Sequence, residues 1–87
     1  MSVRPTVSKA MVRRKIRTAL KLRRAKGLTE ELLLETVSEL CGGGVGLQQL
    51  RDELEYNHAE AFIRSAHDKE ADETHWIITP KGNDEDI

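Results

Sequence analysis

Basic side chains are concentrated at the start of the chain, and their type and spacing suggest a site that binds anions. Residues 1–27 hold ten Lys and Arg and no acid, a charge of +10, whereas residues 28–87 hold four cations and all fifteen acids, a charge of −11. The net charge of −1 conceals this separation, which a mixed solvated surface would not produce. Within the basic segment, a row with helical spacing is formed by Arg13, Arg17, Lys21 and Arg24.

Such a row is typical of a surface that contacts phosphate. Like charges on one side of a helix lower its stability unless anions lie opposite them. Each Lys or Arg that neutralises a phosphate releases counterions and strengthens binding whatever the base sequence. We therefore predict a nucleic-acid partner, DNA in the first instance. The row could be extended by Arg4, Lys9, Arg14 and Arg23.

Two other interpretations of the basic row remain open. The next helix carries four acids, and packing it beside the first would neutralise the row within one molecule or across a homodimer. An acidic protein partner would have the same effect. The acids are Glu30, Glu31, Glu35 and Glu39.

Apolar residues with helical spacing predict the first helix, from Ser8 to a stop at Gly27. The second helix has Thr29 as its N-cap, because a Thr hydroxyl accepts from the free N–H groups at a helix start. It ends in the glycines that follow Cys41, which favour a helix C-terminus. The apolar positions of these two helices are Val12, Ile16, Ala19 and Leu20, then Leu33, Val37 and Leu40.

A third helix is predicted from about Gly46 to Ala59, with Leu47, Leu50 and Leu54 on its buried side. After Ala59 the spacing fits either more helix or a strand over residues 61–67. We favour a hairpin with a polar turn at residues 68–73, because residues 74–79 are rich in β-branched and aromatic side chains and need a partner strand.

The closing segment Trp76-x-Ile78-Thr79-x-Lys81-Gly82 resembles the last wing strand of winged-helix proteins. The run from Leu50 to Tyr56, followed by residues 62–65, resembles their recognition helix entering the first wing strand. The resemblance covers about residues 9–82 and is closest in character to small phage and prophage winged-helix proteins.

This resemblance implies an α+β fold, a winged helix-turn-helix of three helices followed by a two-stranded hairpin. We expect a winged-helix domain at residues 8–82, with a flexible basic arm at 1–7, where no helical spacing occurs, and an acidic tail at 83–87. Proteins with this fold have either of two functions, and the fold alone does not distinguish them. One is a DNA-binding regulator of phage or prophage transcription, and the other is an adaptor that binds protein and no nucleic acid.

In such a protein the third helix would contact the bases, and here it offers Gln48, Gln49 and Arg51 to bases or phosphates. The same helix also offers acids that phosphate would repel, and the turn at residues 68–73 is acidic as well. We therefore expect the first helix and the arm to carry more of the contact than is usual. The acids of the third helix are Asp52, Glu53 and Glu55.

Other kinds of site find little support. The single Cys41 forms no internal disulfide and suits the cytoplasm. His67 and His75 could face each other across the hairpin, but two ligands hold no structural zinc. The glycines before Leu47 lack the Lys-Ser/Thr ending of a phosphate loop. We expect no catalytic site, no cofactor, no metal and no membrane-spanning segment.

Overall fold

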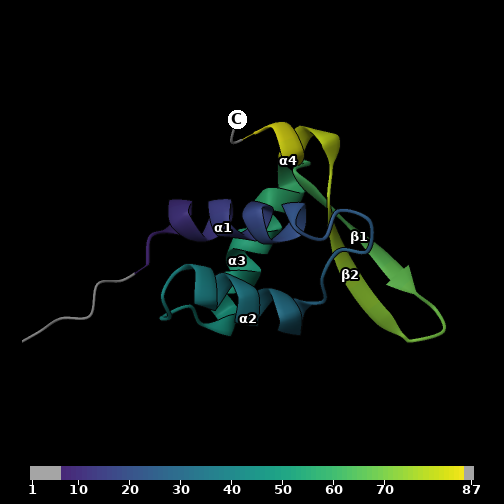
Figure 1. The fold of residues 1–87 in the computed structure, drawn as a ribbon, viewed down its shortest axis with the longest axis horizontal. Helices are drawn as coiled ribbons and strands as arrows, with labels where there is room; N and C mark the ends of the chain where they lie inside the picture. Colours follow the sequence, from purple (N-terminus) through teal and green to yellow (C-terminus); the bar gives the residue numbers. More distant parts are fainter. Residues whose placement is uncertain (1–6, 86–87) are drawn as a thin grey trace, which may run out of the picture.

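Three helices precede a two-stranded antiparallel hairpin in the computed structural model, which describes residues 7–85 (Figure 1). This α+β architecture confirms the predicted fold class, and its layout is consistent with a winged helix. Residues 1–6 of the predicted basic arm, with Arg4, lie outside the described residues. The elements are α1 (Lys9–Lys21), α2 (Glu30–Leu40), α3 (Leu47–Ala59), β1 (Ile63–Asp68), β2 (Glu73–Ile78) and α4 (Pro80–Asp84).

The core lies where the three long helices meet and forms from most of the predicted apolar positions. The prediction is wrong for Leu40 and Leu47, which lie at the ends of their helices and are 38% and 41% exposed. In Figure 1, α1 crosses in front of α3; α2 packs against α1 and is joined to α3 by the ion pair between Glu30 and Arg51. The two predicted helix starts are confirmed: the Ser8 hydroxyl accepts from the N–H of Met11, and the Thr29 hydroxyl accepts from that of Leu32. The fully buried apolar side chains of the helices are Val12, Ile16, Ala19, Leu20, Leu33, Val37 and Leu50.

The first helix ends at Lys21, earlier than predicted, and a turn leads on to Gly27. Gly27 has a φ of +69°, and a Cβ there would lie 2.1 Å from the carbonyl oxygen of Trp76. The next residue, Leu28, forms an antiparallel β-bridge with Trp76 through N–H···O contacts of 3.0 and 2.8 Å. The glycine is therefore required by the close approach of this turn to β2.

The hairpin alternative is confirmed, with Ile63 opposite Ile78 at its base and Asp68 opposite Glu73 at its tip. The predicted facing of the two histidines is wrong. His67 pairs with Thr74, and His75 pairs with Ala66. Because directly paired residues share a face and neighbours alternate, His67 and His75 lie on opposite faces of the hairpin.

The closing segment differs from the predicted wing strand, because β2 ends at Ile78 and a short helix follows. Thr79 caps α4 by accepting from the N–H of Gly82, and its hydroxyl donates to the carbonyl of Ala61 at 2.6 Å. Pro80 occupies the first turn, where a missing N–H costs nothing. The predicted tail at residues 83–87 thus begins inside α4, and residues 86–87 lie outside the described part.

Candidate nucleic-acid interface

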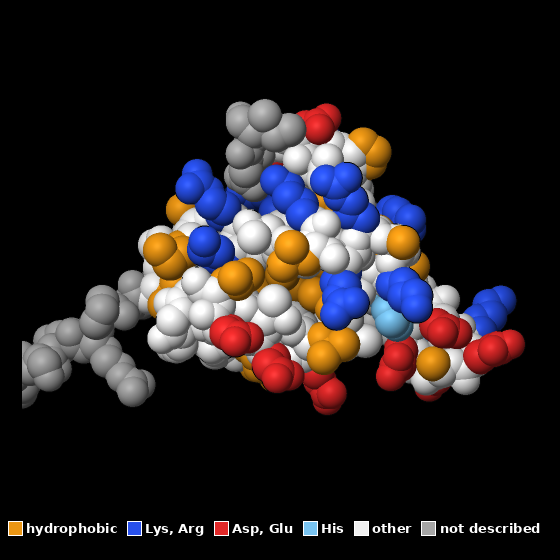
Figure 2. Space-filling view, viewed as in Figure 1, with side chains coloured by type: hydrophobic (Ala, Val, Ile, Leu, Met, Phe, Trp, Pro, Cys, Tyr) orange, Lys and Arg blue, Asp and Glu red, His pale blue; other side chains and the backbone are white. Residues whose placement is uncertain are grey.

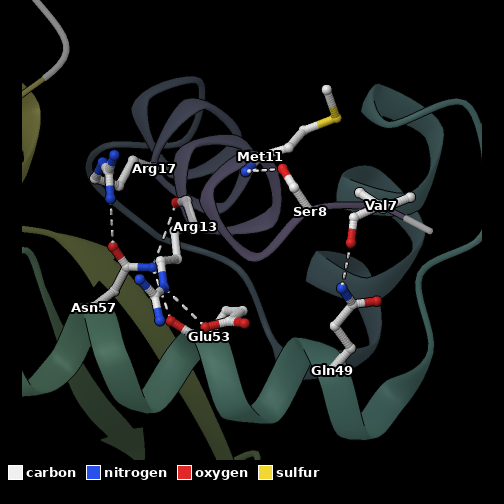
Figure 3. Close-up of polar contacts among 8 residues, drawn as sticks. All are labelled: Val7, Ser8, Met11, Arg13, Arg17, Gln49, Glu53 and Asn57. Carbon is white, nitrogen blue, oxygen red and sulfur yellow. Dashed lines mark hydrogen bonds and ion pairs between the residues drawn. The ribbon is translucent and has the colours of Figure 1, made fainter. Parts of the chain in front are cut away.

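Arg13, the first cation of the predicted row, points toward α3 (Figure 3). Its Nε lies 2.9 Å from Oε1 of Glu53, and the side chains are 31% and 4% exposed. Its guanidinium also stacks on Tyr56, with Cζ 3.6 Å from the ring centroid. Arg13 is therefore held between a carboxylate and an aromatic ring at the α1–α3 interface.

Arg17 lies one turn further along α1 and is buried, with 8% of its surface exposed. Its Nη1 donates to Oδ1 of Asn57 at 2.9 Å, and its Cζ lies 5.1 Å from the ring centroid of Phe62. Asn57 is fully buried, and its amide donates to the carbonyls of Glu53 and Arg13 (Figure 3). This network gives hydrogen-bond partners to both the oxygen and the nitrogen of the Asn57 amide. Without partners, these buried polar atoms would destabilise the fold.

Glu53 was expected on the exposed face of the third helix, and that expectation is wrong. It is 3% exposed and faces α1. A buried carboxylate needs a partner, and Arg13 supplies one. Internal neutralisation of the basic row thus occurs, but the acid comes from α3. On α2, by contrast, Glu30 binds Arg51 of α3.

The three candidate reading residues of α3 all make contacts within the chain. Arg51 binds Glu30 through Nε and Nη2, and this hydrogen bond and charge raise the pKa of the Arg51 guanidinium. Gln49 donates to the carbonyl of Val7 at 3.0 Å, and Gln48 donates to Asp52 at 3.0 Å. Contact with a base would have to replace each of these bonds.

The other two members of the row lie nearer to solvent. Lys21 is partly exposed at the end of α1, and Arg24 is exposed in the following turn. The structure therefore divides the predicted row into an internal pair, Arg13 and Arg17, and an outer pair.

Cations nonetheless cover the outer side of α1. No acid occurs in residues 7–29, so no carboxylate of this stretch interrupts them. In Figure 2 blue side chains lie over α1 in the upper half of the molecule, whereas red side chains lie over α2 and the hairpin tip. This outer basic face comprises the exposed Lys9, Arg14, Arg23, Arg24 and Lys26, with the partly exposed Lys15 and Lys21.

A recess of about 460 Å³ joins the outer basic face to the α1–α3 interface. Its walls include the Tyr56 and Phe62 rings, and Glu85 lies at one side. The recess places the internal guanidinium groups next to the outer ones, so an anion at its mouth would meet several cations. The cations that line it are Arg13, Arg14, Lys15 and Arg17.

The hairpin tip and the exposed side of α3 present the opposite charge. Asp52 and Glu55 are exposed on α3, and Asp68, Glu70, Asp72 and Glu73 are exposed at the tip. These two surfaces would repel phosphate, as the sequence indicated. No group of three His, Cys, Asp or Glu side chains in residues 7–85 could hold a metal ion. Among the same residues, every helix is too short or too polar to cross a bilayer.

Comparison with known proteins finds no family model, no curated protein and no solved structure that matches the chain significantly.

Proposed function

We propose that the protein binds the phosphate backbone of nucleic acid through the outer basic face and does so without reading the base sequence. The observation that carries this proposal is the concentration of exposed cations on α1 and the turn after it, with no acid between residues 7 and 29. A polyanion placed there would meet several Lys and Arg side chains at once, and the released counterions would drive binding.

The orientation follows from the charges of the remaining surfaces. The exposed carboxylates of α3 and of the hairpin tip disfavour insertion of α3 into a major groove, because they would lie beside phosphates. The contacts of Gln48, Gln49 and Arg51 within the chain also oppose base reading by these side chains. Binding through α1 avoids both costs. The resemblance to phage and prophage winged-helix proteins extends the proposal to a cytoplasmic regulator of transcription.

A salt titration with random-sequence duplex DNA tests the proposal. We expect the logarithm of the affinity to fall linearly with the logarithm of salt concentration, by about 0.9 for each phosphate neutralised. The double variant Arg23→Glu with Arg24→Glu should bind at least about tenfold more weakly at low salt. The steepness of its salt dependence, measured as that slope, should fall by about 2. A single-stranded RNA of equal length shows whether the backbone alone is sufficient.

A matched control is Arg64→Glu with Lys69→Glu, which makes the same change of net charge at exposed positions on the hairpin. This variant should retain most of the affinity, since its cations lie outside the outer basic face. Absence of binding to random duplex at low salt would overturn the proposal. Equal losses in both double variants would show that net charge alone matters, and would overturn the assignment to α1.

The adaptor function is the second candidate, and the occupied side chains of α3 favour it. A helix whose exposed face carries Asp52 and Glu55 and whose Arg51 is paired suits a basic protein surface better than DNA. Purification from cells distinguishes the two candidates. A stable protein complex that forms without nucleic acid and is lost in Asp52→Lys with Glu55→Lys would favour the adaptor.

A further inference from the structure

An exposed apolar band runs between α1 and α2. Met11, Thr18 and Leu22 follow at spacings that place them on one side of α1. Met11 and Leu22 are 45% and 70% exposed, and the hydroxyl of Thr18 donates to the carbonyl of Arg14. On α2, Leu32 and Thr36 are one turn apart, and Leu32 is 50% exposed. Side chains of this size are more exposed here than their apolar character favours, so the band is a candidate for contact with another surface.

The two halves of the band lie side by side. A groove of about 500 Å³ is lined by Leu22 from the end of α1 and by Leu32 and Thr36 from α2, with Ala19 and Leu28 also in its wall. At the opposite end, Val7 just before α1 lies beside Gly44 just after α2, since a Cβ on Gly44 would lie 3.6 Å from Cγ2 of Val7. The band therefore follows the α1–α2 contact from one end to the other, with the helices antiparallel. In Figure 2 orange side chains occupy this strip between the blue and red regions.

Opposite charges border the band on its two sides. Lys15 lies on the α1 side, and Arg23 and Lys26 line the groove at its end. On α2, Glu31, Glu35 and Glu39 repeat at every fourth residue and are all exposed. None of these six side chains forms an ion pair with another described residue. The face thus consists of a basic border, an apolar band and an acidic border.

We propose that this face binds a second copy of the same chain. A two-fold axis that runs along the band, between two copies placed face to face, lays each apolar band on the other. The same rotation places the basic border of each copy over the acidic border of its partner. Such a face is complementary to itself, which is the requirement of an isologous interface. Charge complementarity then supports both the register and the orientation of the pair.

The length of the helices sets the size of this interface. Helices of eleven and thirteen residues are about 17 and 20 Å long, so the shared face lies at the small end of the range for stable complexes. We therefore expect an equilibrium between monomer and dimer that depends on concentration and weakens at high salt. The dimer uses three cations of the outer basic face, Lys15, Arg23 and Lys26, but it is tested without nucleic acid, so its failure is distinguishable from failure of the proposed function.

Sedimentation equilibrium of the full chain tests the dimer, from low micromolar to near-millimolar concentration. The wild type should dimerise, and Leu22→Glu with Leu32→Glu should remain monomeric while its circular dichroism shows an intact fold. Leu47→Glu is the matched control, because Leu47 is 41% exposed at the start of α3. A wild type that stays monomeric throughout the range overturns the proposal.

A charge exchange tests the orientation. The variant Lys15→Glu with Lys26→Glu has two acidic borders, and Glu35→Lys with Glu39→Lys has two basic borders. Each should fail to dimerise alone, because like charges then meet, whereas an equimolar mixture should form a heterodimer. Two-fold symmetry along the band requires this rescue. The proposed arrangement would be overturned if either variant alone dimerised as strongly as the wild type, or if the mixture formed no heterodimer.

Discussion

Glu53 of α3 and Arg13 of α1 are joined across the helix interface, with Oε1 of Glu53 2.9 Å from Nε of Arg13. Forty positions separate them along the chain. The carboxylate is almost fully buried and is paired with this guanidinium, while the Asn57 amide donates to the backbone carbonyl of the same Glu53.

Removing either partner of this ion pair should destabilise the fold. Glu53→Gln leaves Arg13 without its carboxylate, and Arg13→Gln leaves a buried charge unpaired. We expect each to lower the free energy of unfolding by about 2 kcal/mol, less than for a fully buried pair, because Arg13 remains partly exposed. Urea denaturation measures both losses. In the double variant the losses should not add, since the two changes remove one interaction. Glu55→Gln on the exposed side of α3 is the control, and additive losses would contradict the coupling.

Gly27→Ala should be among the most destabilising small substitutions in the chain. The new Cβ would meet the backbone of Trp76, and the positive φ is itself unfavourable for alanine. We expect a loss of about 3 kcal/mol in thermal or chemical denaturation. Gly42→Ala is the matched control, because Gly42 also has a positive φ but a Cβ there would meet no atom within 4 Å. Its loss should be about 1 kcal/mol. Equal losses would show that the contact with Trp76 is unimportant.

Ala61→Gly should stabilise the protein. Ala61 follows the last turn of α3 with a φ of +61°, and the N–H groups of Ala61 and Phe62 donate to the carbonyls of His58 and Asn57. This is a Schellman arrangement, in which glycine is favoured at the left-handed position. We expect a gain of about 0.5–1 kcal/mol in the free energy of unfolding. Ala59→Gly, inside α3, should instead lose stability. A loss for Ala61→Gly would contradict the prediction.

Cys41 should react slowly with alkylating agents at neutral pH. Burial raises the pKa of its thiol, and the nearby charge of Lys15 opposes that rise. The folded state therefore favours the neutral thiol. The resulting contribution to stability is complete below the ordinary thiol pKa and is lost as pH rises through the raised one. Lys15→Gln should move the pH profile of the alkylation rate further toward alkaline values. Lys9→Gln is the control, and an unchanged profile in Lys15→Gln would contradict the role of Lys15.

The order of helices and strands could be predicted because local patterns determine it. Val12, Ile16 and Leu20 recur with helical spacing, and the β-branched and aromatic residues around Trp76 favour a strand. The α4 helix was missed although Thr79-Pro80 is a typical helix start. The resemblance to a wing strand obscured that signal.

The environment of the candidate site could not be predicted in the same way. Helical spacing places Arg13 and Arg17 beside the apolar face but does not say which helix covers that side. Asn57 and Glu53, the partners that bury them, belong to α3 and carried no local sign of burial. The contact that requires glycine at position 27 is likewise made by a residue far away in the sequence, because Trp76 approaches Gly27 only in the folded chain.

The separation of basic and acidic faces gives a molecule of net charge −1 a large permanent dipole moment. A polyanion exerts little overall attraction on such a molecule at long range but does exert a torque on it. The protein would turn its α1 side toward the polyanion before any contact forms, which raises the fraction of encounters that begin in a productive orientation. Salt shortens the range of this alignment to about one Debye length, roughly 8 Å at physiological ionic strength.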